Sequence, residues 1–449
     1  MDNSTHRREN FLATPQPMRS NTWSAWLFLT LLLFGSMPDA HAIPAFSRQT
    51  GLSCAACHVG AFGPQLTPLG RRFKLQGYML KSGGGFDPRI SAQVLESFMR
   101  TQKDQPEPPA PGFNTNDNWE LQTIDLYLAG PISDHMGLFT LASYSQNGHT
   151  VGWDMTDLRY ARTSEFGTHS AIWGITLNNA PTITDIYNTA PAWQYPYASS
   201  DLAPGAPASP MIMDAFANAS LGMTAYTQID GKWYLEAGGY RTLSQSFLNK
   251  VNADYLGHLS QTAPYLRVAY ETDLNPQSNL EVGGMYFSPH LQPLGQGVGT
   301  NDYKDYGVDT NYQWSSSDSK HSVTLQGLYV HETQTLNNTY AEGASSNLHN
   351  HLNMMNLNAS YWYNNTYGAS LAAITSLGSS DELLYGGSPN TKGGVAEVSW
   401  VPFGKENSWM QPYVNLRIGL QYAFYTEFAG ETNSASNNNT TYLYFQTLF

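Results

Sequence analysis

The chain has 449 residues, and only 13% of them are charged, whereas about a quarter are charged in an ordinary soluble domain. Lys and Arg total 22 against 35 Asp and Glu, so the formal net charge of −13 argues against nucleic acid as a partner. One long apolar run is too few for a bundle of membrane helices, and the aromatic content of 13% argues against disorder.

Residues 1–42 have the pattern of a secretory signal peptide. Three arginines precede the apolar run 26–35, and the small-residue site Ala40-His41-Ala42 follows it. The run is shorter than the ~20 residues that a helix needs to cross a bilayer, so we expect cleavage rather than a retained anchor. The mature chain then begins at Ile43.

The next motif is Cys54-Ala-Ala-Cys57-His58, which contains the only two cysteines of the chain. C-x-x-C-H is the attachment signature of c-type haem, in which both thiols bind the haem vinyl groups and the histidine ligates the iron. The alternatives are a C-x-x-C redox disulfide and a chance match to the motif. Export of the chain and the position of His58 favour one covalently attached haem c.

Residues 66–79 predict a short helix that could cover one haem face, because Pro68 suits its start and Gly77 its end. The segment 43–89 is too short to fold alone unless a covalent group such as haem stabilises it. It carries six basic side chains against one acidic side chain, a net charge of +5, which leaves −18 for residues 90–449. We therefore expect this cytochrome segment to be drawn into the acidic body that follows it.

From residue 90 onward, apolar and polar residues alternate with a period of two, which predicts β-strands. In 412–424, apolar Leu416 and Leu420 share one face, and Arg417 lies on the other. Most such segments have about 9–12 residues, enough for a tilted strand to cross a bilayer. We expect sixteen of them, starting near residues 90, 120, 136, 153, 168, 216, 232, 264, 278, 304, 321, 353, 367, 393, 411 and 439.

The connections between these segments alternate between short turns and mostly longer loops. Outer-membrane barrels follow this rule, with the short turns in the periplasm. An even number of strands then leaves both ends of the barrel periplasmic, and the terminal Phe449 resembles the C-terminal signal of such barrels. A soluble β-sandwich or propeller also alternates, but the long segments favour an all-β, 16-stranded antiparallel outer-membrane β-barrel in membrane lipid. The longer loops are expected at 102–119, 179–213, 244–263, 332–352 and 427–438.

Three motifs stand together before the barrel: Phe46-x-Arg48-Gln49-Thr50, C-x-x-C-H at 54–58, and Gly70-Arg71-x-Phe73-Lys74-Leu75-x-Gly77-Tyr78. With a sixteen-strand barrel behind them, they resemble the fused monohaem cytochrome–porins, the outer-membrane iron oxidases of iron-oxidising bacteria. The specific motifs cover only residues 43–80. The resemblance implies a haem segment that plugs the lumen, takes electrons from an extracellular donor, most readily Fe(II), and passes them to a periplasmic electron carrier.

Two functions follow from these expectations. The first is an electron conduit acting as a ferrous iron oxidase, and the second is a diffusion porin whose haem segment is a structural plug or gate. A covalent cofactor is not needed to block a pore, so the sequence favours the conduit, for iron or another donor. An H-E-x-x-H metal-binding motif begins at His331 but is incomplete, because position 335 is threonine. His349 and His351 fall in or beside a long loop, where a solvated loop is favoured over a metal site.

The second axial ligand of the iron, opposite His58, is expected to be a methionine. Ferrous iron in acid requires an oxidant of high potential, and His/Met ligation raises the potential of haem. Met79 is the first candidate and Met99, on an inward strand face, is the rival; a barrel histidine is a third option. Acidic lumenal groups such as Glu271 and Glu281 are expected to concentrate ferrous ions without forming one tight site.

Overall fold

The computed structural model describes residues 45–80, 87, 89–213, 215–295, 297, 299–405, 407–411 and 413–449. The predicted signal peptide and the predicted start of the mature chain lie outside these residues. All described residues belong to one compact unit, Ala42–Phe449.

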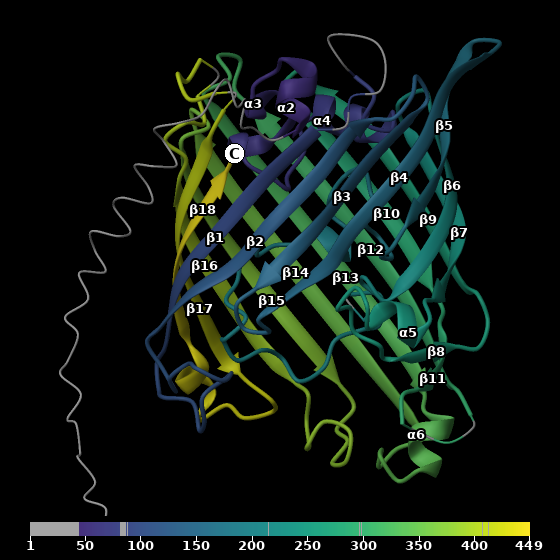
Figure 1. Ribbon diagram of the computed structural model, residues 1–449, viewed down its shortest axis with the longest axis vertical. Helices are drawn as coiled ribbons and strands as arrows, with labels where there is room; N and C mark the ends of the chain where they lie inside the picture. The colour runs from purple at the N-terminus through teal and green to yellow at the C-terminus, as the bar shows by residue number, and fades with distance from the viewer. Residues whose placement is uncertain are drawn as a thin grey trace, which may run out of the picture. The chain divides into compact units, whose positions relative to one another are not determined.

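The body of this unit is a closed antiparallel β-barrel (Figure 1). Among the described residues, sixteen long strands each pair with the next, and β1 closes the ring against β18, as predicted. The strands are β1 (Arg89–Thr101), β2 (Asn118–Pro131), β3 (Met136–Ser145), β4 (Thr150–Phe166), β5 (His169–Asn178), β6 (Ser220–Ile229), β7 (Trp233–Thr242), β9 (Ala263–Asn275), β10 (Ser278–Phe287), β12 (Asn301–Ser315), β13 (His321–Thr335), β14 (His349–Tyr363), β15 (Tyr367–Gly378), β16 (Thr391–Trp400), β17 (Asn415–Glu427) and β18 (Thr440–Leu448). Two short strands, β8 (Gly257–Leu259) and β11 (His290–Pro293), pair with each other beyond the long ones.

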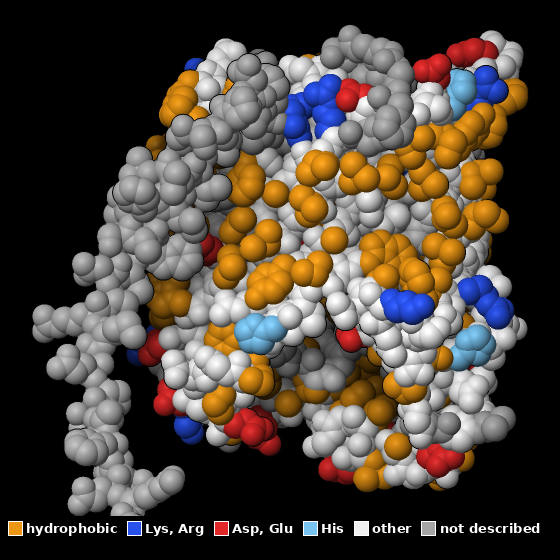
Figure 2. All heavy atoms as spheres, viewed as in Figure 1, with side chains coloured by type: hydrophobic (Ala, Val, Ile, Leu, Met, Phe, Trp, Pro, Cys, Tyr) orange, Lys and Arg blue, Asp and Glu red, His pale blue; other side chains and the backbone are white. Residues whose placement is uncertain are grey.

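The two faces of the wall differ as the alternation predicts. On β9, Leu266 and Val268 point outward and are each 47% exposed, whereas Arg267 between them is 1% exposed. On β17, Leu420 is exposed and Arg417 is buried. Apolar side chains spread in a band over the outer face in Figure 2. Apolar outside and polar inside is the arrangement of a barrel that spans an outer membrane.

Short helices occupy the N-terminal segment and the loops. The segment 45–80 contains α2 (Ala45–Thr50), α3 (Cys54–Cys57), the 3-10 turn η1 (Val59–Ala61) and α4 (Pro68–Leu75). The predicted helix is therefore found, with Pro68 in its first turn and the Thr67 side chain accepting a hydrogen bond from the Gly70 N–H. In the described part of the chain, no helix is long and apolar enough to cross a membrane. The loops add η2 (Pro191–Trp193), α5 (Gln245–Leu248), α6 (Asn337–Ala341) and η3 (Ala435–Asn438).

The two ends of the barrel carry different structures. Figure 1 shows α2, α3, α4 and the C-terminus at one end, together with short connections such as 167–168 and 276–277. The longer connections, including those that carry α5 and α6, lie at the other end. We call these the short-turn end and the long-loop end.

One of the predicted longer loops lies inside the barrel. Residues 179–219, the inward loop, start and finish at the long-loop end, but Ile183, Asp185 and Tyr187 are 0% exposed. The inner wall explains the position, because Asp185 forms an ion pair with the lumenal Arg267 at 3.0 Å. The sequence predicts 179–213 as one of the longer loops, and the structure adds that this loop folds back into the lumen.

Candidate haem-attachment site

The C-x-x-C-H motif forms one tight turn. Cys54 and Cys57 are the first and last residues of α3, and the His58 N–H donates to the Cys54 carbonyl at 2.9 Å. Residues three apart share one face of a helix, so both thiols are presented to one side. Both are free cysteines in the part of the chain that the structure describes. Burial raises the pKa of Cys54 to about 11, and the proximity of Cys57 adds to this effect.

His58 has the state that a metal-ligating imidazole requires. Burial lowers its pKa to about 4. The ring is therefore neutral at ordinary pH, as ligation demands. Its Nδ1 atom is buried and has no hydrogen-bond partner among the described residues. Two thiols on one face and a neutral histidine directly after them fit the attachment of haem c.

Helix α4 packs directly against this turn. A Cβ atom on Gly70 would lie 2.2 Å from the Cys57 carbonyl oxygen, so only glycine allows this approach. The Thr67 N–H donates to the same oxygen at 3.0 Å, and its hydroxyl donates to the Ala56 carbonyl at 2.6 Å. The start of α4 thus fixes the orientation of α3.

The segment 45–80 contacts lumenal side chains on opposite parts of the wall. Its Arg71 pairs with Glu271 on β9 at 2.8 Å, and the Tyr78 hydroxyl donates to Asp157 on β4 at 2.6 Å. The basic residues therefore meet the acidic wall, as the uneven charge predicts. Further hydrogen bonds join Gln65 to Gln326 on β13, Leu66 to Gln313 on β12 and Ala61 to Asn415 on β17.

The inward loop meets the same segment from the other side. The Lys74 ammonium donates to the Ile183 carbonyl at 2.8 Å and to the Asn188 side chain at 2.9 Å, and it lies 4.2 Å from the centre of the Trp193 ring. Asn188 in turn donates to the Pro64 carbonyl at 2.7 Å. The N-terminal segment and the inward loop are thus joined inside the lumen.

The two candidate methionine ligands lie in different clusters. Met79 is half-buried and packs against the cluster that contains Leu75 of α4 and Tyr187 of the inward loop. Met99 is 1% exposed and faces inward, as predicted, but it packs with Leu202 and Tyr442. Met79 therefore shares its surroundings with the helix that covers the motif, and Met99 does not. The axial role of either residue stays a prediction.

The lumenal glutamates face inward as expected, but they already have basic neighbours. Glu271 is the partner of Arg71, and Glu281 lies 3.7 Å from Arg267. A paired carboxylate attracts metal ions less than a free one, and the role of these two groups in concentrating ferrous ions stays a prediction. Within the described residues, no three His, Cys, Asp or Glu side chains group as a metal site.

The sequence did not predict which residues of the wall bind the N-terminal segment. Buried Arg159 on β4 donates to Asp157 at 2.7 Å and to the Lys74 carbonyl at 3.3 Å. Asp157 and Arg159 are two residues apart, so they lie on the same polar face of a predicted strand. This pair of opposite charges could have indicated the contact from the sequence.

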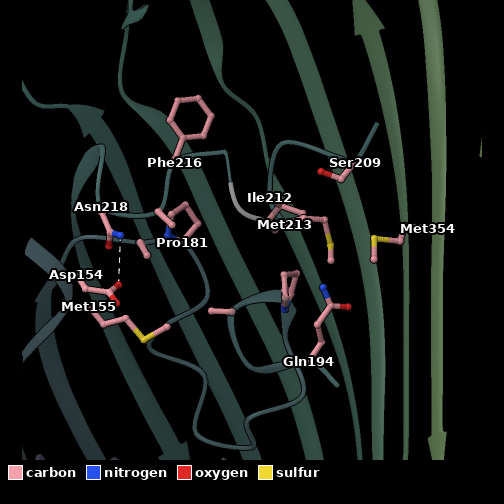
Figure 3. A pocket seen from close by; sticks show the side chains of 14 residues that line it. Asp154, Met155, Pro181, Gln194, Ser209, Ile212, Met213, Phe216, Asn218 and Met354 are labelled. Atoms are coloured by element: carbon pink, nitrogen blue, oxygen red, sulfur yellow. Dashed lines mark hydrogen bonds between the residues drawn. The ribbon is translucent and has the colours of Figure 1, made fainter. Parts of the chain in front are cut away.

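A cavity of about 320 Å³ lies between the inward loop and the wall (Figure 3). Asp154 and Met354 line it from the wall, and Ile212, Met213 and Phe216 line it from the loop. The lining includes no residue of the segment 45–80, so the cavity is separate from the C-x-x-C-H turn.

Comparison with known proteins gives similarity of fold only. No protein-family model and no curated protein matches the chain. The channel DcaP of Acinetobacter baumannii is 12% identical with a TM-score of 0.47, over 83% of this chain and 99% of that one. OmpF of Salmonella typhi, in complex with daunomycin, is 15% identical with a TM-score of 0.46, over 81% of this chain and 98% of that one. OmpT of Vibrio cholerae is 11% identical with a TM-score of 0.43, over 83% of this chain and 99% of that one. These values are low, so the assignment as a porin-like outer-membrane barrel rests on the strand pairing itself.

Proposed function

We propose that the chain is an outer-membrane c-type cytochrome whose N-terminal segment carries one haem c inside the barrel. Cys54 and Cys57 would attach the haem and His58 would ligate its iron, with Met79 as the preferred second ligand. When bound, the haem supplies reversible one-electron transfer. The observation that carries the proposal is the α3 turn, with two free thiols on one face and a neutral His58 whose Nδ1 has no partner in the described chain.

The surrounding residues have defined tasks in this proposal. A segment of 36 described residues, 45–80, is too small to enclose a haem, so the barrel wall and the inward loop would exclude water from it. The segment is held to the wall by Arg71 and Tyr78 and to the inward loop by Lys74. A haem held there would lie in the lumen near the short-turn end, where a carrier at that end could take up its electron. The donor would be outside the cell, and the acceptor would be a periplasmic carrier at the short-turn end.

Ferrous iron is the first donor to test, since the sequence motifs resemble those of iron oxidases. The experiment is anaerobic mixing of the purified, haem-loaded protein with ferrous iron while the absorbance band of reduced haem is recorded. Prompt reduction by Fe(II) supports a ferrous iron oxidase. A loaded protein that other donors reduce, but iron does not, would remain a conduit with a different donor.

The second candidate function is a porin in which the segment 45–80 acts as a structural plug or gate. The porin-like barrel favours it, because sixteen strands surround a lumen wide enough for solutes when it is not filled. The haem stain of a denaturing gel separates the two functions. Covalent haem on the purified chain supports the cytochrome, and its absence after expression with the c-type maturation system supports the porin.

A further inference from the structure

Arg71 is buried inside the barrel, and the N–H donors on its Nε and Nη2 atoms are unused in the described chain. Its side chain is 3% exposed, and its Nη1 atom donates to Glu271 at 2.8 Å and to Asn279 at 2.7 Å. Nε and Nη2, by contrast, are buried and have no partner among the described residues. These two atoms form one straight edge of the guanidinium group, which is the edge that binds a carboxylate through two parallel hydrogen bonds.

The neighbouring Tyr187 carries a second such donor. Tyr187, on the inward loop, is 0% exposed, and its hydroxyl has no partner at hydrogen-bond geometry in the described chain, although the Gln228 side chain lies nearby. The Arg71 guanidinium carbon lies 5.6 Å from the centre of the Tyr187 ring. Leaving buried donors unpaired is unfavourable, and more so for a charged group than for a neutral one. Two such groups together point to a ligand that accepts hydrogen bonds and carries negative charge.

The position of Arg71 connects this edge with the C-x-x-C-H turn. Arg71 directly follows Gly70, the residue whose contact with the Cys57 carbonyl leaves no room for a Cβ atom. The side chain therefore starts beside the second haem-attaching cysteine and extends toward β9 and the inward loop. Haem itself carries two propionate carboxylates, and each is a planar, two-oxygen anion of the kind that this edge accepts.

We propose that the Nε–Nη2 edge of Arg71, together with the Tyr187 hydroxyl, binds a haem propionate. The inference rests on the proposed function and extends it with a propionate-binding pair that joins α4 to the inward loop. Glu271 does not compete for this edge, because it uses Nη1 and a guanidinium has donors for two carboxylates. The propionate would thereby tie the haem to the loop that enters from the long-loop end.

The protein's own Glu281 is the competing source of a carboxylate. Both of its oxygens are buried without a hydrogen bond among the described residues. One of them lies 3.7 Å from Arg267 and would contact a Cβ atom on Gly283 at 2.8 Å. Glu281 is thus directed at Arg267 in this structure, but a rotation could bring it to Arg71, so the test includes it.

The test uses the full chain with haem attached and compares Arg71→Gln, Arg71→Lys and Tyr187→Phe with wild type. Arg72→Gln is the matched control, since Arg72 is the next residue on α4 and is exposed. The readouts are the propionate bending band in the resonance Raman spectrum and the midpoint potential as a function of pH. A paired propionate stays ionised, whereas an unpaired one takes up a proton more readily when the haem is reduced.

Arg71→Gln is expected to shift the Raman band, to lower the potential, and to add a pH dependence in the range where carboxylates titrate. Tyr187→Phe and Arg71→Lys should shift the band less, and Arg72→Gln should leave the band and the pH profile unchanged. A wild-type band and pH profile in fully loaded Arg71→Gln would overturn the inference. A change of the potential and the pH profile without a shift of the propionate band would assign these changes to the protein's own carboxylates, Glu271 or Glu281, and would overturn the inference. If Arg71→Gln does not assemble, unchanged spectra in Arg71→Lys and Tyr187→Phe overturn it.

These outcomes separate the inference from the proposed function. A wild-type chain without covalent haem stain removes the basis of both. A stained wild-type chain whose Arg71 variants match it removes only the propionate assignment and leaves the cytochrome proposal standing.

Discussion

Three adjacent side chains decide whether the N-terminal segment carries haem. Cys54 and Cys57 lie on one face of α3, and His58 follows with an unpartnered Nδ1 among the described atoms. Each thiol forms one of the two covalent links in a c-type site. The barrel wall does not depend on these links, because its strands pair with each other.

Replacing Cys54 with alanine is therefore expected to reduce or abolish covalent haem while the barrel still assembles. The measurements are haem staining on a denaturing gel and the heat-dependent gel mobility that reports a folded barrel. Asn415→Ala, a change at a neighbouring wall residue, is the control for altered packing and should keep the stain. Undiminished staining of Cys54→Ala would reject the attachment site.

The axial methionine is tested by a pair of variants. Met79→Ala is expected to remove the weak red-edge band of methionine–iron bonding and to lower the midpoint potential, since His/Met ligation raises it. Met99→Ala should retain both properties, because Met99 packs with Leu202 and Tyr442 rather than with α4. Loss of the band in Met99→Ala alone would transfer the role to Met99. Survival of the band in both variants would indicate a different methionine, and its absence from wild type would favour a histidine ligand.

Helix α4 acts as the support of the attachment turn. Its Gly70 leaves no space for a side chain against the Cys57 carbonyl, where a Cβ atom would lie at 2.2 Å. Substitution with valine is expected to push α4 away from α3, and overpacking of this kind costs about 1–3 kcal/mol. Proteolysis of the segment 45–80 in detergent should become about tenfold faster while the barrel remains folded.

Gly205 on the inward loop provides the matched control for this substitution. A Cβ atom there would meet nothing within 4 Å, so Gly205→Ala should leave the proteolysis rate unchanged. Equal protection of Gly70→Val and wild type would show that α4 does not depend on this contact.

Lys74 makes the contact between α4 and the inward loop sensitive to pH. Burial lowers its pKa to about 7, and the neighbouring Arg159 lowers it further. An unfolded lysine keeps its proton up to about pH 10. Between these values the undocked segment binds more protons than the docked one, so docking is expected to strengthen as the pH rises through this window.

The measurement is protease protection of the segment 45–80 at several pH values. Wild type should become better protected from pH 7 upward, and Lys74→Met should lose this dependence because it has no group to titrate. Arg72→Met, a change at an exposed position on the same helix, should behave as wild type. A dependence that persists in Lys74→Met would show that another group is responsible.

At the scale of the whole molecule, the sequence predicts the wall better than the contents of the lumen. Strand faces follow from a local period of two, which Leu266, Arg267 and Val268 illustrate. The inward loop could not be predicted, because its position depends on pairing between Asp185 and Arg267, far apart in the chain. The C-x-x-C-H motif is local and was recognisable, whereas the unused edge of Arg71 becomes visible only when β9 and the inward loop surround it.

The lumen is filled in the structure, and whether solutes pass this filling distinguishes an electron conduit from a diffusion porin. The segment 45–80 contacts the wall at Glu271 on β9, Gln326 on β13 and Asn415 on β17, and it is joined to the inward loop through Lys74. A barrel of sixteen strands leaves an aqueous channel unless its interior is occupied. The conduit requires electrons, not solutes, to pass, so an occupied lumen is consistent with it.

We therefore expect the intact chain to conduct ions poorly in a planar lipid bilayer. A variant that lacks residues 45–80 should conduct strongly, because the inward loop alone then remains in the lumen. Deletion of 340–346, which lies in a connection at the long-loop end, is the control and should keep the low conductance of the intact chain. Haem-loaded wild type that conducts as well as the 45–80 deletion would mean that solutes pass the segment, and the porin function would then take precedence over the conduit.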